Sequence, residues 1–237
     1  MPQIGTLITG AGIQTNITGL TQCDAIITIG SVDTTNPLQG LIVEIDGTTF
    51  LNIPAASLIT AYQKWMMSVV GAIIGIALKI ATGRINKPTN LRFTNAGATT
   101  PAIYAFSDSN DGIPFVVASQ QINASSYADF SQFAALFIQT PANVSSAEVT
   151  FRKNVGPDQF VYYKQTMAIQ DLATLFAMQP LNEAEASGYL GGVLVIDNRA
   201  QTVESVRIYC STANTILVAK LPQESFDVAK RMAQGAR

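Results

Sequence analysis

The chain has 237 residues, of which 48% are hydrophobic and only 13% are charged, and its net charge is −2. Soluble domains carry about 25% charged residues, so much of this surface must be neutral and polar or buried against a neighbouring protein. The length suits one large domain or two small ones. The weak charge, with no basic arm before the first apolar segment, argues against direct packaging of nucleic acid.

Most of the chain consists of short β-branched and aromatic runs separated by Gly, Asn, Asp, Pro and Thr, a pattern typical of strands and turns. Asp46-Gly47 lies between two apolar runs and predicts a tight hairpin. In chain order, the predicted strands are Thr6–Thr9, Asp24–Gly30, Leu41–Ile45, Thr49–Ile53, Asn90–Asn95, Ala102–Ser107, Phe115–Ala118, Ala135–Gln139, Ala147–Arg152, Gln159–Tyr163, Gly192–Asp197, Ser205–Ser211 and Thr215–Leu221.

Helical spacing of apolar residues interrupts the strands. A first helix is predicted over Ala55–Ile80, a second over Met167–Met178 and a short tail helix over Ser225–Gln234. The uncharged run Trp65–Leu78 in the first helix is shorter than the roughly 20 apolar residues that a membrane span needs. We interpret it as a buried core helix, with contact to lipid as the alternative. The N-terminal residues lack the basic region and cleavage site of a signal peptide.

The residues that usually carry catalysis or bind metals are scarce. The chain has no histidine, which removes the usual general base and the commonest metal ligand. Glu183 and Glu185 fit a solvated turn better than a catalytic pair. Asp108–Gly112 resembles the start of a calcium loop, but Ser119 stands where a bidentate Glu is required. No catalytic, cofactor-binding or metal-binding residue is therefore predicted, and an enzyme is the least favoured class.

The chain has two cysteines, Cys23 and Cys210, which lie far apart in the sequence and form no CxxC motif. We favour two free, buried thiols and keep a disulfide as the alternative.

The two halves of the chain carry similar features in the same order. The matched segments are Gly40–Ile45 with Ser146–Phe151, Leu91–Asn95 with Leu194–Asn198, and Ile103–Ser107 with Ile208–Ser211. The offset is nearly constant, at 106 residues from Val43 to Val149 and 103 residues from Leu91 to Leu194. A duplication of this size predicts two β-sandwiches in tandem.

The order of strand, Asp-Gly turn, strand and helix is carried by Leu41–Phe50 and the helix after it, and closing strands follow at Ser205–Ser211 and Thr215–Leu221. This pattern resembles the double jelly-roll major capsid proteins of icosahedral bacteriophages with an internal membrane, in the lineage that also contains adenovirus. It is most similar to the small corticovirus-type capsid proteins. The resemblance covers most of the chain, but the chain is short for two jelly rolls, and its first helix is longer and more apolar than the family pattern.

The resemblance implies an all-β fold of two jelly-roll β-sandwiches in tandem, with short flanking α-helices. Residues 1–125, with the helix at about 55–80, would form the first jelly roll, and residues 126–237 would form the second with a C-terminal helix. It also implies a structural virion protein that self-assembles as trimers into an icosahedral shell over an internal membrane. Its partners would be copies of itself, other virion proteins and lipid, without direct contact to nucleic acid, and its location would be the virion after synthesis in the host cytoplasm.

The candidate residues for membrane or inter-subunit contact are Trp65, Lys230, Arg231 and Arg237. A basic residue near an anionic lipid surface contributes about 1 kcal/mol, and a solvated tail helix is the alternative. Two further functions stay open. One is a membrane-associated minor virion protein with Trp65–Leu78 in lipid, and the other is a surface carbohydrate-binding or adhesive β-sandwich.

Overall fold

A computed structural model of the chain describes residues 3–8, 13–20, 26–31, 38–70, 77–82, 85, 88–97, 100–106, 115–157, 159–176, 189–190, 192–198 and 202–221. These residues form two compact units, one within Met1–Ala118 together with Leu221 and the other within Ser119–Lys220. The division between the units falls at Ala118, inside strand β9 (Val116–Ile122), which is described below with the second unit; the predicted boundary follows Ser125.

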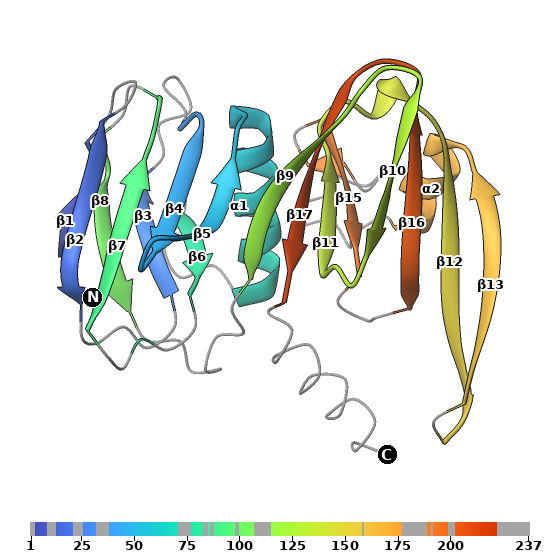
Figure 1. The fold of residues 1–237 in the computed structure, drawn as a ribbon, viewed down its shortest axis with the longest axis horizontal. Coiled ribbons are helices and arrows are strands. Elements are labelled where there is room, and N and C mark those ends of the chain that lie inside the picture. Colours follow the sequence, from blue (N-terminus) through green and yellow to red (C-terminus); the bar gives the residue numbers. More distant parts are fainter. Residues whose placement is uncertain are drawn as a thin grey trace. The chain divides into compact units, whose positions relative to one another are not determined.

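Among the described residues, the first unit has one helix and eight strands arranged in two layers (Figure 1). The sheet orders are β1-β8-β3-β6 and β2-β7-β4-β5. Side chains of alternate residues along these strands are fully buried, as at Val43 and Leu41 on one sheet and Ile27 and Ile29 on the other. The elements are β1 (Gln3–Thr6), β2 (Gln14–Leu20), β3 (Ile26–Ser31), β4 (Leu41–Ile45), β5 (Thr48–Ile53), α1 (Ala56–Val70), β6 (Ala77–Ala81), β7 (Thr89–Thr94) and β8 (Ala102–Phe106).

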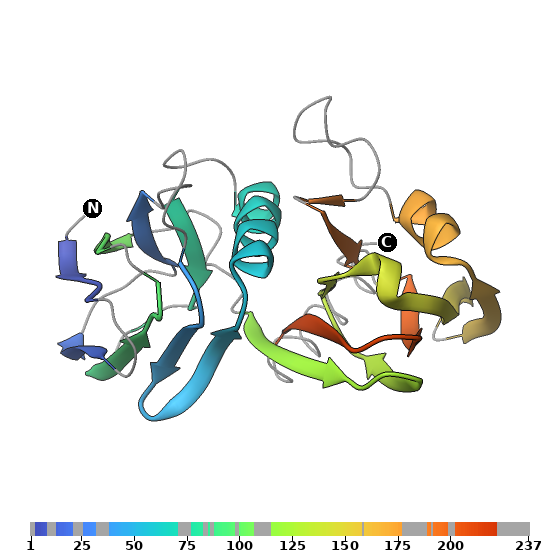
Figure 2. The same cartoon turned by 90° about the horizontal axis from the view of Figure 1, so that it is seen from above.

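The second unit has the same two-layer organisation, with sheet orders β10-β16-β12-β13 and β14-β15-β11-β17-β9. Its core is a cluster of buried aliphatic and aromatic side chains from both sheets, covered in part by α2. Figure 2 shows the layers from above. The elements are β9 (Val116–Ile122), β10 (Ser126–Ser131), β11 (Ala135–Ile138), a 3-10 turn (Pro141–Asn143), β12 (Val144–Gly156), β13 (Gln159–Met167), α2 (Ile169–Leu175), β14 (Tyr189–Leu190), β15 (Val193–Asp197), β16 (Val203–Cys210) and β17 (Asn214–Lys220).

The two units share one strand topology. When the two-residue β14 is set aside, the described part of each unit has eight strands, and the first, eighth, third and sixth are hydrogen-bonded neighbours in one sheet. The second, seventh, fourth and fifth form the other sheet, and a helix lies between the fifth and sixth strands of each unit. Two facing four-stranded sheets with these connections make a jelly roll. The predicted fold class, two jelly-roll sandwiches in tandem, is therefore confirmed.

The shared topology also corrects part of the predicted repeat. Gly40–Ile45 and Ser146–Phe151 lie in the fourth strands, β4 and β12, as the match requires. The two later matches are displaced by one strand, because they pair the seventh strand with the sixth (β7 with β15) and the eighth with the seventh (β8 with β16). The displacement arises because the predicted helix over Ala55–Ile80 covers most of β6, the sixth strand of the first unit.

The predicted helix over Ala55–Ile80 is wrong at its C-terminal end, where Ala77–Ile80 lies in a strand. Helix α1 ends at Val70, and Ala77–Ala81 forms a strand paired with β3. An uninterrupted apolar run fits either a helix or a buried strand, so periodicity could not separate the two. Residues 71–76 lie outside the described residues, and none of the described helices is long and apolar enough to cross a membrane. Of the other predicted helices, α2 is shorter than Met167–Met178, and the tail helix lies outside the described residues.

An asparagine connects equivalent loops in each unit. In the first unit the Asn95 Oδ1 accepts hydrogen bonds from the backbone N–H groups of Gln39 and Gly97, both at 3.1 Å. In the second unit the Asn214 Oδ1 accepts from the N–H groups of Thr140 (3.1 Å) and Thr215 (2.9 Å), and its Nδ2 donates to the Thr140 carbonyl at 2.9 Å. Asn95 follows the seventh strand of its unit and Asn214 is the first residue of the eighth strand of its unit. Each binds the segment that follows the third strand. The similarity of the two units therefore extends from the topology to individual contacts.

We expect Asn214→Ala to lower the free energy of unfolding by about 2 kcal/mol, because it removes three hydrogen bonds from partly buried backbone groups. Asn95→Ala removes two such bonds, and the buried Nδ2 of Asn95 has no acceptor among the described residues. Its removal relieves that desolvation cost, so the loss should be smaller. Urea unfolding followed by circular dichroism measures both losses, and an equal or larger loss for Asn95→Ala would contradict the contacts described.

Candidate assembly surfaces

Charged and aromatic side chains gather on the outer face of the β10-β16-β12-β13 sheet. Successive side chains of a strand point to opposite faces, and Ala128, Phe130, Val149, Val206 and Ile208 are buried on the inner face. Their neighbours in the chain therefore point outward. The register places Asp129 of β10 opposite Arg207 of β16, and Arg207 opposite Glu148 of β12. A row of alternating charge thus crosses three strands.

The charges in this row are paired within the chain. The Arg207 guanidinium donates two hydrogen bonds to Asp129, from Nε to Oδ1 at 2.7 Å and from Nη2 to Oδ2 at 3.1 Å. It also lies over the Tyr127 ring, 4.7 Å from the centroid, and Lys164 of β13 pairs with Glu148. The Arg207 hydrogen bond lowers the pKa of Asp129, and the Lys164 hydrogen bond lowers the pKa of Glu148 against the opposing effect of desolvation. In the first unit, Arg92 lowers the pKa of Glu44 in the same way.

These pKa shifts predict how stability depends on pH. A carboxyl whose pKa is lower in the folded chain than in the unfolded chain stabilises the fold above its ordinary pKa of about 4, and this contribution is lost as pH falls through the lowered value. The chain has no histidine that could titrate at higher pH. We therefore expect a melting temperature that is constant from about pH 7 to pH 5 and falls below about pH 4. A decline centred near pH 6 would contradict this assignment, and Asp129→Asn should make the acid decline shallower.

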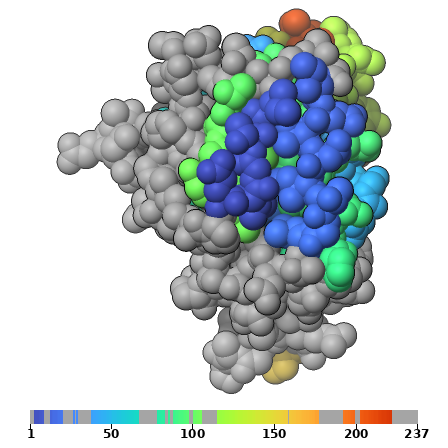
Figure 3. Space-filling view, turned by 90° about the vertical axis from the view of Figure 1, so that its left-hand side faces the viewer, coloured from blue at the N-terminus to red at the C-terminus, as the bar shows by residue number. Residues whose placement is uncertain are grey.

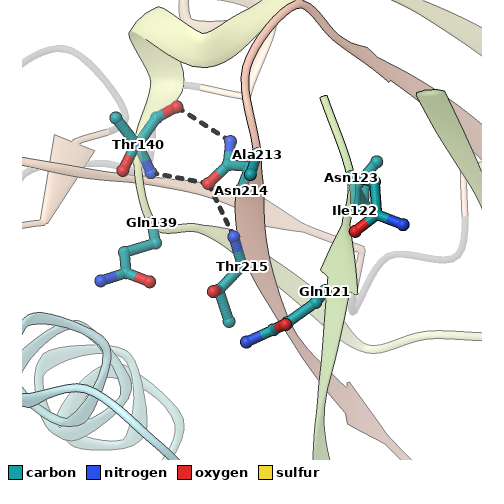
Figure 4. A pocket seen from close by; sticks show the side chains of 8 residues that line it. All are labelled: Gln121, Ile122, Asn123, Gln139, Thr140, Ala213, Asn214 and Thr215. Carbon is teal, nitrogen blue, oxygen red and sulfur yellow. Dashed lines mark hydrogen bonds between the residues drawn. The ribbon is translucent and has the colours of Figure 1, made fainter. Parts of the chain in front are cut away.

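A pocket of about 200 Å³ lies at one end of the second unit (Figure 4). It is lined by Gln121, Ile122, Asn123, Gln139, Thr140, Ala213, Asn214 and Thr215. The Asn214 amide already binds the backbone of Thr140 and Thr215. The lining offers amides and hydroxyls but no ionisable side chain, so it holds neither a general base nor a charged ligand-binding group.

The first unit presents its N-terminal strands, β1 and β2, on the face shown in Figure 3. Two isoleucines that flank these strands, Ile8 and Ile13, are 51% and 43% exposed. Isolated exposed apolar side chains are common on soluble proteins. This face therefore gives a weaker indication of a contact surface than the outer face of the second unit.

Trp65 lies inside the first unit rather than on its surface. Its side chain is 0% exposed, and its ring lies 6.1 Å from that of Tyr62 and 5.1 Å from that of Phe115, edge to face. Contact between Trp65 and lipid or another subunit would require the first unit to open. Burial also raises the pKa of the Tyr62 hydroxyl.

The other residues singled out in the sequence mostly lie outside the described residues. These are Lys230, Arg231 and Arg237, together with Glu183, Glu185, Cys23 and the Asp108–Gly112 segment. Cys210 is a free, buried thiol, and burial raises its pKa. Among the described residues, no cluster of three or more Cys, Asp or Glu side chains could hold a metal ion.

Sequence reasoning missed the outer face because it did not predict strand β10. The segment Ser126–Ser131 does alternate, with Tyr127 and Asp129 outward and Ala128 and Phe130 inward. That alternation of period two was the available signal. Its pairing with β16 depends on a register that local sequence does not reveal.

Comparison with known proteins identifies the fold. No family model matches the chain, and no curated protein matches its sequence. Among solved structures, it is similar to the major capsid protein P2 from bacteriophage PM2, with a TM-score of 0.55 and 11% identity over 92% of this chain and 96% of that chain. The Yersinia pseudotuberculosis-derived mitogen has a TM-score of only 0.19, at 13% identity over 46% of this chain and 86% of that chain.

The chain is thus an all-β protein with the double jelly-roll fold, because the first likeness spans both units. In particular, that likeness is to a phage major capsid protein. The resemblance expected from the sequence is confirmed at the level of the fold.

Proposed function

We propose that this chain is a bacteriophage major capsid subunit, which assembles with copies of itself into the shell of a virion. The observation that carries the proposal is the likeness to a phage major capsid protein over 92% of the chain, a length that includes both jelly rolls. A fold alone does not define a function. The composition and the paired surface charges add support.

A shell subunit must bury several surfaces against neighbours. Unpaired charges make such burial costly, because their desolvation is not repaid. On the outer face of the second unit, Asp129 pairs with Arg207 and Glu148 pairs with Lys164 within one chain. Only 13% of the residues are charged. This protein can therefore bury its surface against neighbouring subunits at a low electrostatic cost, because the cores of protein interfaces are depleted in charged residues.

Three copies would give a capsomer with six similar jelly rolls, since each chain supplies two with one topology. Such a trimer tiles a shell with a nearly sixfold outline, and closed symmetric assembly repeats the same modest contacts many times. We place the trimers in an icosahedral shell over an internal membrane, where Lys230, Arg231 and Arg237 would meet anionic lipid headgroups. Other virion proteins would occupy the remaining positions.

The test is the mass of the purified chain in solution without detergent, from light scattering after size exclusion. A trimer, or larger closed particles visible by electron microscopy, is expected. A chain that stays monomeric up to about 100 μM, far above the dissociation constant of a stable interface, would contradict the capsid function. A chain that requires detergent would instead favour a membrane-associated minor virion protein.

A further inference from the structure

One strand edge in the second unit is both unpaired and apolar. Strand β13 is the last strand of the β10-β16-β12-β13 sheet, and only β12 pairs with it among the described residues. The hairpin of β12 and β13 extends past the end of β16 (Figure 1), because pairing between β12 and β16 stops at Phe151 while pairing with β13 continues to Gly156. An isolated two-stranded ribbon is marginally stable in water.

This hairpin carries a large share of the exposed apolar side chains. Val155, Val161, Tyr162 and Tyr163 are each 50% to 54% exposed. They lie on both faces of the ribbon, because Val161 and Tyr163 share the face of Phe151 and Tyr162 lies on the other. Soluble proteins usually protect a long edge strand with charges, prolines or bulges. Strand β13 has no proline and one charged residue, Lys164.

We propose that β13 pairs antiparallel with β13 of a second copy of this chain, about a twofold axis through Tyr163. The inference rests on the proposed function, because it takes a copy of the chain as the partner. In an antiparallel pair, a residue whose backbone N–H and C=O point toward the partner strand faces another residue of the same kind. When two identical strands pair about a twofold axis, the axis therefore passes through a residue position and not between two residues. An axis at Tyr163, the midpoint of Gln159–Met167, aligns the whole nine-residue strand.

The side chains fit this register. Tyr163 faces Tyr163 of the other copy, and Lys164 faces Tyr162 of the other copy, so the ammonium group meets an aromatic ring. An axis moved to Lys164 would place the two lysines opposite each other, which destabilises a strand pair. An axis moved to Tyr162 would shorten the aligned segment. The longest register is therefore also free of like-charge contacts, and it joins two four-stranded sheets into one.

A cysteine at the axis tests the pairing, because directly opposite residues have Cβ atoms about 5 Å apart and can form a disulfide. We expect mild oxidation of Tyr163→Cys to give a covalent dimer whose link, mapped by mass spectrometry, joins position 163 to position 163. The control is Tyr127→Cys on β10, at the opposite edge of the same sheet and equally exposed (53%). It should give no dimer of its own above the background from Cys23 and Cys210.

A second variant tests the register without altering the core. Tyr162→Lys places a lysine opposite Lys164 of the other copy, and the two like charges repel. The double variant Tyr162→Lys/Tyr163→Cys should therefore form at least about fivefold less crosslinked dimer at low salt than Tyr163→Cys alone. About 1 M NaCl screens the repulsion and should restore the crosslinking. Circular dichroism checks that each variant is folded. Trimers or shells without the 163–163 link would overturn the pairing and leave the proposed function intact. If the 163–163 link forms but the chain makes neither trimers nor shells, the pairing is supported and the capsid function is overturned. A monomer without the link would overturn both the pairing and the capsid function.

Discussion

Replacing Trp65 with alanine is expected to destabilise the first unit by about 4 kcal/mol, the cost of a large-to-small change at a packed aromatic core position. The Trp65 side chain is 0% exposed and contacts the rings of Tyr62 and Phe115. Alanine leaves a cavity between α1 and the residue that precedes β9. Such a loss is a large part of the stability of an ordinary domain, so the first unit of the variant should unfold at much lower urea concentrations.

The measurement has a built-in probe, because Trp65 is the only tryptophan in the chain. In the unsubstituted protein its fluorescence follows the first unit, while circular dichroism follows both units. The fluorescence change of the unsubstituted protein identifies which circular dichroism transition belongs to the first unit. Trp65→Ala should shift that transition to lower urea concentration. Trp65→Phe, which keeps an aromatic ring, should shift it by less than half as much. If Trp65→Ala costs under about 1 kcal/mol, the indole is not the core residue described here and can serve as a contact to lipid or a subunit.

The sequence predicted most of the strands because their local pattern agrees with their pairing. All of the predicted strands overlap a strand of the structure, and Leu41–Ile45 has the same bounds. These runs are rich in β-branched and aromatic residues, and turn residues end them. The jelly-roll class followed from the order of these strands and did not require their exact bounds.

The elements that were missed depend on partners distant in the chain. Strand β2 contains polar residues and Gly19, whose φ is +67°, and its edge is paired with β7. Strand β6 is apolar at nearly every position, so its pairing with β3 decides its conformation. In both cases tertiary pairing overrides a weak or ambiguous local preference.

The charged face was missed for the same reason. Asp129 and Arg207 are 78 residues apart, and only the register between β10 and β16 brings them together. The residues chosen from the sequence were a tryptophan that proved to be buried and three basic residues outside the described part of the chain. A role for Lys230, Arg231 and Arg237 at a membrane stays a prediction.

In the second unit, Asn198→Ala is expected to lower the free energy of unfolding by about 3 kcal/mol, because it removes three buried hydrogen bonds to backbone groups. The Asn198 side chain is 4% exposed. Its Nδ2 donates to the carbonyls of Phe133 (3.2 Å) and Val203 (2.9 Å), and its Oδ1 accepts from the Val203 N–H at 3.0 Å. These bonds join the end of β15 to the start of β16 and to the segment before β11.

The matched control is Asn143→Ala, the same substitution at a site where the asparagine side chain makes one exposed hydrogen bond, from Nδ2 to the Ala213 carbonyl at 2.7 Å. It should cost less than about 1 kcal/mol, since water can replace the lost partner. Urea unfolding monitored by circular dichroism compares the two variants directly. The Trp65 fluorescence transition should stay in place in both, because each asparagine belongs to the second unit. If Asn198→Ala were no more damaging than Asn143→Ala, the connection between the two sheets would have to lie elsewhere in the unit.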